Sequence, residues 1–289
     1  MHGDPLANGA CVLCGRAEAD LLFRKHGWPH VRCRGCGLIS LRPLPSEDQL
    51  AQHHERSYAA GAYAAFAAAD AVRRAVARDR LQHLLPRAPL GPWLDIGASS
   101  GAFVAEALAA GLDAQGIEVA ATAVALARER DLPVHQARVE DFVPPKPLAV
   151  ITAFDVVEHL PRPLPVLARL RQWLVPGGLL ALTVPNAASL AARLLGRHWY
   201  YYAAPDHVHH FTPQTIVRLL EAAGLQDLGV EAIAKPLPLD YATQQLDRLA
   251  PVLAPLFHAV RLAVPRRWWA RPLRLPLGEM LVTARPAPA

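Results

Sequence analysis

The sequence predicts an α/β protein built on a doubly wound, mostly parallel sheet of seven strands, with a small cysteine-rich module and a helical lid before it. Three observations support this prediction. From residue 92 onward, short apolar runs alternate with amphipathic segments and short connections, which is the pattern of βαβ units. All 4 cysteines lie within the first 36 residues. The stretch between these parts, residues 47–85, has a helical pattern.

The composition fits a protein with a sizeable hydrophobic core. Of the 289 residues, 52% are hydrophobic and 19% are charged, which excludes a largely disordered chain. The formal net charge of +5 comes from scattered arginines, which disfavours nucleic acid as a partner. The N-terminus lacks the features of a secretory signal, and no apolar run reaches the roughly 18 residues that span a bilayer. We therefore expect a cytoplasmic protein.

Two C-x-x-C pairs predict a zinc ribbon over residues 1–45. Cys11 and Cys14 form the first pair, Cys33 and Cys36 form the second, and a glycine follows each pair. Four thiolates fill the tetrahedral shell of Zn²⁺ and leave no position for a catalytic water. We therefore expect a structural zinc site. Disulfides are a poor explanation for these thiols in a cytoplasmic protein.

The next segment, residues 46–88, is expected to be a helical lid or linker. Ser46 is a suitable N-cap, and Glu47 and Asp48 supply an acidic first turn. The simplest function of this segment is to pack a helix pair on the main domain. The alternative is a lid over a ligand site.

Residues 89–235, together with a final strand in segment 278–289, supply the predicted sheet. The expected strands are 93–96, 114–119, 133–136, 148–154, 178–184, 227–234 and 279–284. The expected helices are 101–110, 120–130, 163–174 and 213–223. Pro176-Gly177-Gly178 is expected to be a turn that stops one helix and starts the following strand.

The proline-rich segment 236–277 interrupts this alternation and is expected to be an insertion. Within it, residues 246–269 combine a helical apolar pattern with Arg266-Arg267-Trp268-Trp269. Tryptophan beside arginine is typical of an anchor at a membrane surface, but packing of the insertion on the core is the favoured interpretation.

The turn after the first strand of the main domain predicts a ligand site. Strand 93–96 carries Asp95 and continues into the turn Gly97-Ala98-Ser99-Ser100-Gly101, after which a helix begins. Such a strand, small-residue turn and helix form a cradle for a nucleotide-like ligand. A nicotinamide dinucleotide requires G-x-G-x-x-G, and Ser99 and Ala102 replace its second and third glycines.

The ligand is therefore expected to lack phosphates, with an amino-acid part and a ribose lying across the turn. Glu118 ends the second strand, where its carboxylate can accept hydrogen bonds from two vicinal ribose hydroxyls. The motifs that follow one another in this region are WLDIGASSGAF, GIEVA, VEDF, ITAFDVVEHLPRP, WLVPGGLLALTVPN and DHVHHFTPQTIVRLLEAAGL. Together they resemble the class I S-adenosylmethionine-dependent methyltransferases, in particular the branch of the ubiquinone-biosynthesis O-methyltransferases. The resemblance covers residues 90–235 and the final strand, and it implies a seven-stranded sheet whose last strand is antiparallel.

The resemblance also implies roles for individual residues. The expected cofactor-binding residues are Asp95, Gly97, Ala98, Ser99 and Gly101 under the methionine part, Glu118 at the ribose with Val119 beside it, Asp141 and Phe142 at the adenine, and Phe154 beneath the methyl group. The chain departs from the family at Ser99, where many members have glycine, and at Ala149, where the fourth strand usually opens with aspartate. We expect both departures to be tolerated.

The segment Asp155-Val-Val-Glu158-His159 is the expected catalytic region, because it ends the fourth strand at the ligand-binding edge of the sheet. In the ubiquinone-type enzymes, the matching acidic-x-x-Glu-His group is associated with a divalent metal near the acceptor, so the resemblance implies Mg²⁺ here. His159 is the first choice for a general base, since imidazole titrates near neutral pH. Alternatively, Glu158 caps the next helix and His159 is a core residue.

A second cluster, Asp206-His207-Val208-His209-His210, follows the aromatic run Trp199–Tyr202. It comes after the fifth strand, where this fold builds acceptor pockets, and we expect His207 to take part in catalysis. If the segment is extended, His207 and His209 share one side. The three histidines are also a candidate metal site, although pocket-lining and helix-capping roles are commoner.

These features predict an S-adenosylmethionine-dependent enzyme that methylates a small molecule. The leading interpretation is O-methylation of a hydroxyl on a secondary metabolite, a sugar or an isoprenoid-like compound. The alternatives are sugar C-methylation, RNA methylation, and a non-catalytic protein in which the zinc ribbon binds a partner and the methyltransferase fold is vestigial. RNA methylation would require a contiguous basic face joining the ribbon to the cleft.

Overall fold

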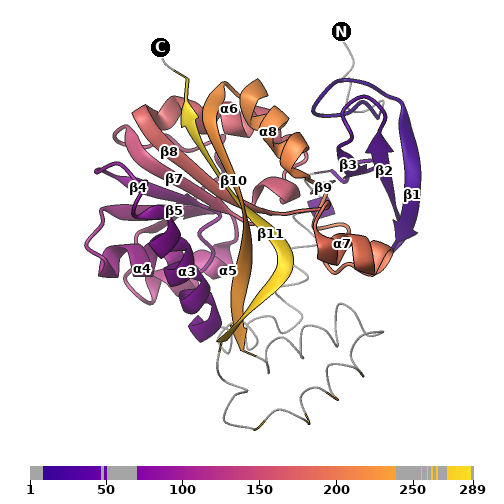
Figure 1. Cartoon of the computed structure of the whole chain (residues 1–289). Helices are drawn as coiled ribbons and strands as arrows, with labels where there is room; N and C mark the ends of the chain where they lie inside the picture. The colour runs from indigo at the N-terminus through magenta and orange to yellow at the C-terminus, as the bar shows by residue number, and fades with distance from the viewer. Residues whose placement is uncertain are drawn as a thin grey trace.

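Two sheets organise the computed structural model (Figure 1). The structure describes residues 9–46, 49–50, 70–238 and 272–287, with the single positions 255, 259, 262 and 265. Most of the predicted lid and almost all of the predicted membrane-contact segment 246–269 lie outside the described residues. In the part of the chain that is described, no helix is both long enough and apolar enough to cross a bilayer.

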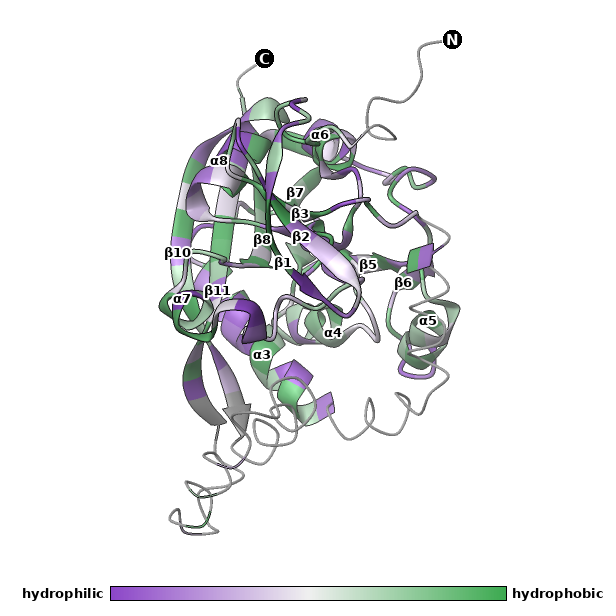
Figure 2. Cartoon of the chain, turned by 90° about the vertical axis from the view of Figure 1, so that its right-hand side faces the viewer, coloured by the Kyte–Doolittle hydropathy of each residue, from purple (hydrophilic) through white to green (hydrophobic). Residues whose placement is uncertain are grey.

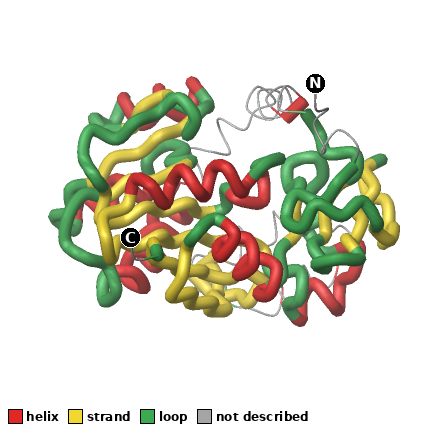
Figure 3. The backbone as a smooth tube through the Cα atoms, turned by 90° about the horizontal axis from the view of Figure 1, so that it is seen from above, coloured by secondary structure: helices red, strands yellow, loops and turns green. Residues whose placement is uncertain are grey.

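The smaller sheet belongs to the cysteine-rich module. Its antiparallel strands are β1 (Ala19–Lys25), β2 (Trp28–Cys33) and β3 (Ile39–Leu41). His26 and Gly27 both have positive φ and join β1 to β2, as a two-residue hairpin turn requires. A short strand from the main domain, β9 (His209–His210), pairs with β3 and completes the order β1-β2-β3-β9. Seen from above, this module lies at one end of the molecule, beside the larger sheet (Figure 3).

The larger sheet has seven strands in the order β10-β11-β8-β7-β4-β5-β6. Strands β8, β7, β4, β5 and β6 are parallel, and β11 lies antiparallel between β8 and β10. The bounds are β4 (Trp93–Ile96), β5 (Ala114–Glu118), β6 (Val134–Gln136), β7 (Leu148–Phe154), β8 (Leu174–Pro185), β10 (Leu225–Pro238) and β11 (Pro272–Pro286). This arrangement confirms the predicted doubly wound sheet with an antiparallel last strand.

Helices cover both faces of the larger sheet (Figure 1). One face carries α3 (Asp70–Leu84), α4 (Ala102–Ala109) and α5 (Ala121–Arg128), and the other carries α6 (Pro163–Trp173) and α8 (Pro213–Ala222). Both α6 and α8 begin with a proline, whose fixed φ suits the first helical position. The shorter elements are η2 (Val157–His159), α7 (Leu190–Leu195) and η3 (Gly196–His198).

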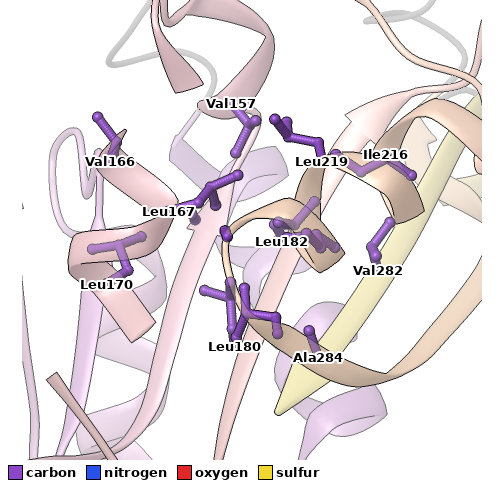
Figure 4. Packing of buried hydrophobic residues seen from close by; sticks show 14 of the residues in the cluster. Val157, Val166, Leu167, Leu170, Leu180, Leu182, Ile216, Leu219, Val282 and Ala284 are labelled. Atoms are coloured by element: carbon purple, nitrogen blue, oxygen red, sulfur yellow. The ribbon is translucent and has the colours of Figure 1, made fainter. Parts of the chain in front are cut away.

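The sheet forms because its central strands are apolar on both faces (Figure 2). In β7, all residues except Phe154 are buried. The leucines of β8 interdigitate with Leu167 of α6 and Leu219 of α8, as Figure 4 shows. Cys11, Cys33 and Leu38 of the cysteine-rich module belong to the same buried cluster, so the module shares the core of the main domain.

Two strand boundaries differ from the sequence prediction. Strand β8 begins at Leu174, and Pro176-Gly177-Gly178 forms an irregularity inside it, because the pairing with β7 shifts between Leu148 and Val150. Strands β10 and β11 pair as far as Pro238 and Pro272, so both ends of the predicted insertion are β structure. Alternation patterns missed this extension because prolines occupy the outer part of the ribbon.

Candidate functional site

The turn after β4 has the backbone of a tight ligand cradle. Gly97 and Gly101 have φ values of 69° and 78°, in the left-handed region that favours glycine. A Cβ at Gly97 would lie 2.7 Å from Cγ2 of Val156, and one at Gly101 would lie 2.7 Å from Cδ1 of Leu132. Ser99 also has a positive φ, 51°, so serine takes a conformation in which glycine would be unstrained.

Two carboxylates hold this turn. Asp95 is buried in β4 and accepts a hydrogen bond of 2.6 Å from Oγ1 of Thr152. Burial raises the pKa of Asp95 to about 7, and the Thr152 hydroxyl opposes the shift. Glu118, at the end of β5, accepts hydrogen bonds from the backbone N–H groups of Ser99 at 2.9 Å and Val119 at 2.8 Å. These bonds fix the Glu118 carboxylate at the carboxyl edge of the sheet, where such folds bind their ligands.

A cavity of about 430 Å³ opens over the turn. The expected cofactor residues that line it are Asp95, Gly97, Ala98, Ser99 and Phe154. Gly101, Glu118, Val119, Asp141 and Phe142 are not among its described lining residues. Asp141 lies in an exposed turn, and the ring of Phe142 packs between those of His135 and Trp173.

Helix α3 forms the opposite wall of the cavity, through Val72, Val76 and Arg80. It is fixed to α4 by Glu106, which accepts hydrogen bonds from Arg74 at 2.7 Å and Arg78 at 2.9 Å. The last part of the predicted lid segment therefore lines the cavity, and its role as a lid stays a prediction.

Asp155 lies on the cavity wall in an ion-paired setting that the sequence analysis missed. Its carboxylate accepts hydrogen bonds from Arg80 at 2.7 Å and from Oγ1 of Thr183 at 2.8 Å, and Nζ of Lys235 lies 3.7 Å away. Burial alone would raise the pKa of Asp155, but the cations of Arg80 and Lys235 hold it well below its usual range. Asp155 is therefore ionised and has no basic character to offer in proton transfer. Sequence patterns give no signal for this group, because its members come from α3, β7, β8 and β10.

A second buried carboxylate, Glu279 of β11, adjoins this group. It accepts hydrogen bonds from the Tyr201 hydroxyl and from Nζ of Lys235. Burial, together with the charge of Asp155, raises the pKa of Glu279 to about 8. Glu279 and Tyr201 were not predicted as site residues, since only the insertion of β11 between β8 and β10 brings them together.

The turn η2 brings together three of the predicted catalytic residues. Donor atoms of Glu158, His159 and His207 all lie within 4.8 Å of one another. The rings of His159 and His207 meet edge to face with centroids 4.6 Å apart, and the ring of Tyr201 stacks on His207 at 5.8 Å. Glu158 is buried and does not cap α6, whose N-cap Arg162 has no side-chain capping bond.

The remaining histidines of the cluster lie elsewhere. Nδ1 of His209 lies 3.0 Å from Oγ of Ser40, and its Nε2 lies 3.3 Å from the Pro161 carbonyl oxygen. The ring of His210 stacks on that of His30. Among the described residues, His207 lies with Glu158 and His159, whereas His209 and His210 contact the cysteine-rich module. The alternative in which the three histidines form a metal site of their own is therefore not supported. The reason is that β9 pairs with the cysteine-rich module, which turns His209 and His210 toward it.

Backbone hydrogen bonds connect the module to η2. The Leu41 N–H donates to the Val208 carbonyl at 2.9 Å, and the Val208 N–H donates to the Glu158 carbonyl at 2.9 Å. Lys25 also donates to the carbonyl of Trp199 at 3.1 Å. The module is thus hydrogen-bonded to the segment that carries His207 and, through it, to the turn that carries Glu158 and His159.

The four cysteines of the module converge as predicted. Their sulfurs lie within 4.8 Å of one another, with 3.5 Å between Cys11 and Cys36 and between Cys14 and Cys33. Tetrahedral Zn²⁺ with bonds of about 2.3 Å separates its sulfurs by about 3.8 Å. The Gly35 N–H lies 3.4 Å from the Cys33 sulfur, which suits a thiolate ligand. The donor set therefore fits a closed zinc site.

Comparison with known proteins identifies the larger domain. The family model described as methyltransferase domain matches residues 69–230, which is more than half of the chain. The chain belongs to this methyltransferase family. The curated ubiquinone biosynthesis O-methyltransferase of Thiobacillus denitrificans is 27% identical over 164 residues, which span 51% of this chain and 70% of that protein.

Solved structures support the same methyltransferase fold. A SAM-dependent methyltransferase from Archaeoglobus fulgidus superposes with a TM-score of 0.52 at 20% identity, covering 76% of this chain and 98% of that one. A SAM-dependent methyltransferase from Thermotoga maritima superposes with a TM-score of 0.51 at 16% identity, covering 77% of this chain and 95% of that one. The protein is a methyltransferase of the class I, S-adenosylmethionine-dependent kind, as its sequence motifs predicted.

Proposed function

We propose that this methyltransferase transfers the methyl group of S-adenosylmethionine to a hydroxyl oxygen of a small molecule. The observation that carries the proposal is the position of the cavity, between the cradle after β4 and the ionised Asp155 after β7. Asp95 and the Gly97–Gly101 turn would hold the methionine part in the cavity. Glu118, which is not among the described lining residues, would hold the ribose at the edge of the cavity. Asp141 and Phe142 would then flank the adenine outside the cavity, at the position that the family resemblance implies.

The ionised Asp155 suits the chemistry of a sulfonium. The methyl donor carries a positive charge, and Asp155 and Phe154 line the cavity where the methyl group would lie. A carboxylate that is ionised before the ligand arrives stabilises a cation without having to release a proton. Arg80 and Lys235 keep that carboxylate oriented and balance its charge in the protein without ligand.

The acceptor side would be formed by η2 and the aromatic segment before β9. In this region Tyr200 and Tyr201 supply flat walls, and His159 and His207 supply imidazole nitrogens. An imidazole there would take the hydroxyl proton as the carbon–oxygen bond forms, while the pair of electrons of the broken carbon–sulfur bond stays on sulfur. A secondary metabolite, a sugar or an isoprenoid-like compound remains the proposed acceptor, and the name of the curated relative favours O-methylation.

The cysteine-rich module, residues 1–45, is proposed to be a structural zinc ribbon. The proposed domain order after it is the lid at 46–88, the cofactor-binding domain at 89–235, the insertion at 236–277 and the last strand at 278–289. The four converging sulfurs support the ribbon. Mg²⁺ bound by Asp155, Glu158 and His159, which the family resemblance implies, does not fit, because Arg80 and Lys235 occupy Asp155. No step is therefore assigned to Mg²⁺.

Titration calorimetry with S-adenosylhomocysteine tests the cofactor part of the proposal. We expect micromolar binding to the zinc-loaded protein and a loss of at least tenfold in Glu118→Ala. Glu140→Ala, a change at an exposed carboxylate, is the matched control and should bind like the wild type. Absence of binding to folded wild type would overturn the proposal.

The acceptor part requires a second experiment. The protein is incubated with methyl-labelled S-adenosylmethionine and a panel of hydroxylated phenols, sugars and polyprenylated compounds, and labelled product is identified by mass spectrometry. We expect an O-methyl ether and a strong decrease in its rate for His159→Ala with unchanged S-adenosylhomocysteine affinity. A methyl group on carbon, or on added RNA, would replace O-methylation with one of the alternative activities.

A further inference from the structure

Glu158, His159 and His207 face one another at the junction of η2 and the segment before β9. Their donor atoms lie within 4.8 Å of one another, although His207 is far from the other two in sequence. The hydrogen bond from the Val208 N–H to the Glu158 carbonyl, 2.9 Å long, fixes the two segments together. Ring packing between His159 and His207 fixes the two imidazoles.

The Glu158 carboxylate carries the second observation. Its side chain is only 1% exposed, and neither carboxylate oxygen has a hydrogen-bond partner among the described residues. Nδ1 of His207 is also buried and has no hydrogen-bond partner among the residues that the structure describes. A buried carboxylate without partners is costly unless a proton or a cation joins it. Both groups belong to the cluster whose donor atoms lie within 4.8 Å of one another, so they point to a cation there.

The donor set differs from the one that the family resemblance implies. Oδ1 of Asp155 accepts from Thr183, and Oδ2 accepts from Arg80 with Lys235 nearby, so two cations already surround this carboxylate. A metal ion bonded directly to Asp155 would therefore have to displace one of these hydrogen-bond donors. His207, which the resemblance does not include, supplies the third donor instead.

We propose that Glu158, His159 and His207 form a two-histidine, one-carboxylate site for a borderline divalent ion such as Zn²⁺, Fe²⁺ or Co²⁺, and not for Mg²⁺. Imidazole is a preferred ligand of these ions, whereas Mg²⁺ prefers an all-oxygen shell. Three protein ligands leave coordination positions open, in contrast to the four sulfurs of the ribbon. If the proposed function holds, an open position would face the acceptor hydroxyl and lower its pKa. The proton would then pass to water, and the two imidazoles would hold the ion instead of acting as the base.

Cobalt spectroscopy tests the site without requiring an acceptor. The full-length protein is first loaded with one equivalent of Zn²⁺ to fill the ribbon, and Co²⁺ is then titrated. We expect one further equivalent to bind, with visible d–d absorption and without thiolate-to-cobalt charge-transfer bands. A large excess of Mg²⁺ should not displace it.

Four variants define the ligands. Glu158→Gln and His207→Phe should lower the affinity for the second Co²⁺ at least tenfold, and His207→Phe keeps the ring packing against His159 and Tyr201. Asp155→Asn should retain the second Co²⁺, since Asp155 is not a ligand. His198→Ala, at an exposed histidine outside the cluster, is the matched control. Thermal melting establishes that each variant is folded. Titration with S-adenosylhomocysteine tests the proposed cofactor binding separately, so that its failure can be told apart from failure of the metal site.

Three results would overturn the proposal. The first is the absence of a second equivalent of Co²⁺ in folded wild type. The second is a second equivalent that His207→Phe retains. The third is displacement of the second Co²⁺ by Mg²⁺ together with loss of the second Co²⁺ in Asp155→Asn. That result would support the oxygen-rich site that the family resemblance implies.

Discussion

The cofactor cradle and the ribbon junction are assembled in opposite ways. The cradle is made of residues 95–118, from two consecutive βα units, and its bonds connect neighbours in the sheet. We define the junction as β3, residues 207–210 and η2 with the residues that follow it to Pro161. Its contacts connect segments that are far apart in the chain: His209 contacts Pro161, about 50 positions away, and Ser40, about 170 positions away. The cradle is therefore a local property of the chain, whereas the junction exists only in the completed fold. We therefore expect that a change in one region leaves the structure and the binding properties of the other region unchanged.

Removal of zinc is expected to have the largest effect, and it is confined to the junction. Structural zinc contributes roughly 10 kcal/mol to small metal domains, so Cys33→Ser or chelation should unfold the ribbon. Hydrogen exchange at Leu41 and Val208 should accelerate strongly, because their hydrogen bonds depend on β3. S-adenosylhomocysteine affinity should change less than about threefold, and re-addition of zinc should restore protection. An equal loss of S-adenosylhomocysteine binding would mean that the two regions form one cooperative unit.

Gly97→Ala is expected to damage the cradle alone. The new Cβ would meet Cγ2 of Val156 at 2.7 Å, and the left-handed φ of 69° adds strain. Together these cost about 2–4 kcal/mol, which should appear in the free energy of unfolding and in S-adenosylhomocysteine affinity.

Gly111→Ala is the matched control for this change. Gly111 has a φ of 80° but nothing within 4 Å of the added Cβ, so only the backbone strain remains. Its unfolding free energy should decrease by about 1 kcal/mol with unchanged S-adenosylhomocysteine affinity. Equal effects of the two variants would show that the Val156 contact does not shape the cradle.

The cradle should also be pH-sensitive through Asp95. Its pKa in the folded protein, about 7, lies above the ordinary value of 3.8. Between these values the folded state holds a proton that the unfolded state has lost, so stability falls as pH rises, by up to about 1.4 kcal/mol per unit. Asp95 is assigned to the methionine part, whose ammonium would favour the ionised carboxylate. S-adenosylhomocysteine affinity should therefore rise by about fivefold from pH 6 to pH 7.

Calorimetry and denaturation across pH 5–8 check this prediction. In Asp95→Asn both pH dependences should flatten, whereas Asp113→Asn, at a surface carboxylate, should keep them. A pH-independent affinity in the wild type would contradict the assignment of Asp95 to the ligand ammonium.

Ser40→Ala is expected to have the smallest effect and to sharpen the description of the junction. It removes the partner of the buried Nδ1 of His209, at a cost of about 1–2 kcal/mol. Exchange at Val208 should accelerate moderately, while binding in the cradle stays the same.

The contrast between the two regions also explains what the sequence could predict. Asp95, the glycines of the turn and Glu118 occur in one stretch whose order defines a βαβ unit, and the structure brings them to the same sheet edge. The C-x-x-C pairs are equally local, and their sulfurs converge. The seven strands followed from the alternation of apolar and amphipathic segments, and the antiparallel last strand from the family resemblance.

Long-range contacts account for what could not be predicted. Arg80, Lys235 and Glu279 come from α3, β10 and β11, and no periodicity relates them to Asp155. The separation of His207 from His209 depends on the pairing of β9 with β3, which propensity cannot reveal in a two-residue strand. The predicted base His159 lies beside His207, but the ion pairs that hold Asp155 emerge only from the tertiary structure.

The position of β11 has a consequence for how the protein is made. This strand follows every other described strand in the chain, yet it lies between β8 and β10 and delivers Glu279 to Lys235 and Tyr201. During synthesis on the ribosome, β8 therefore keeps an open edge, and Lys235 lacks one of its carboxylate partners, until β11 has emerged. The cradle can form before β11 is made, whereas the charged wall beside it is completed only once β11 has emerged and paired.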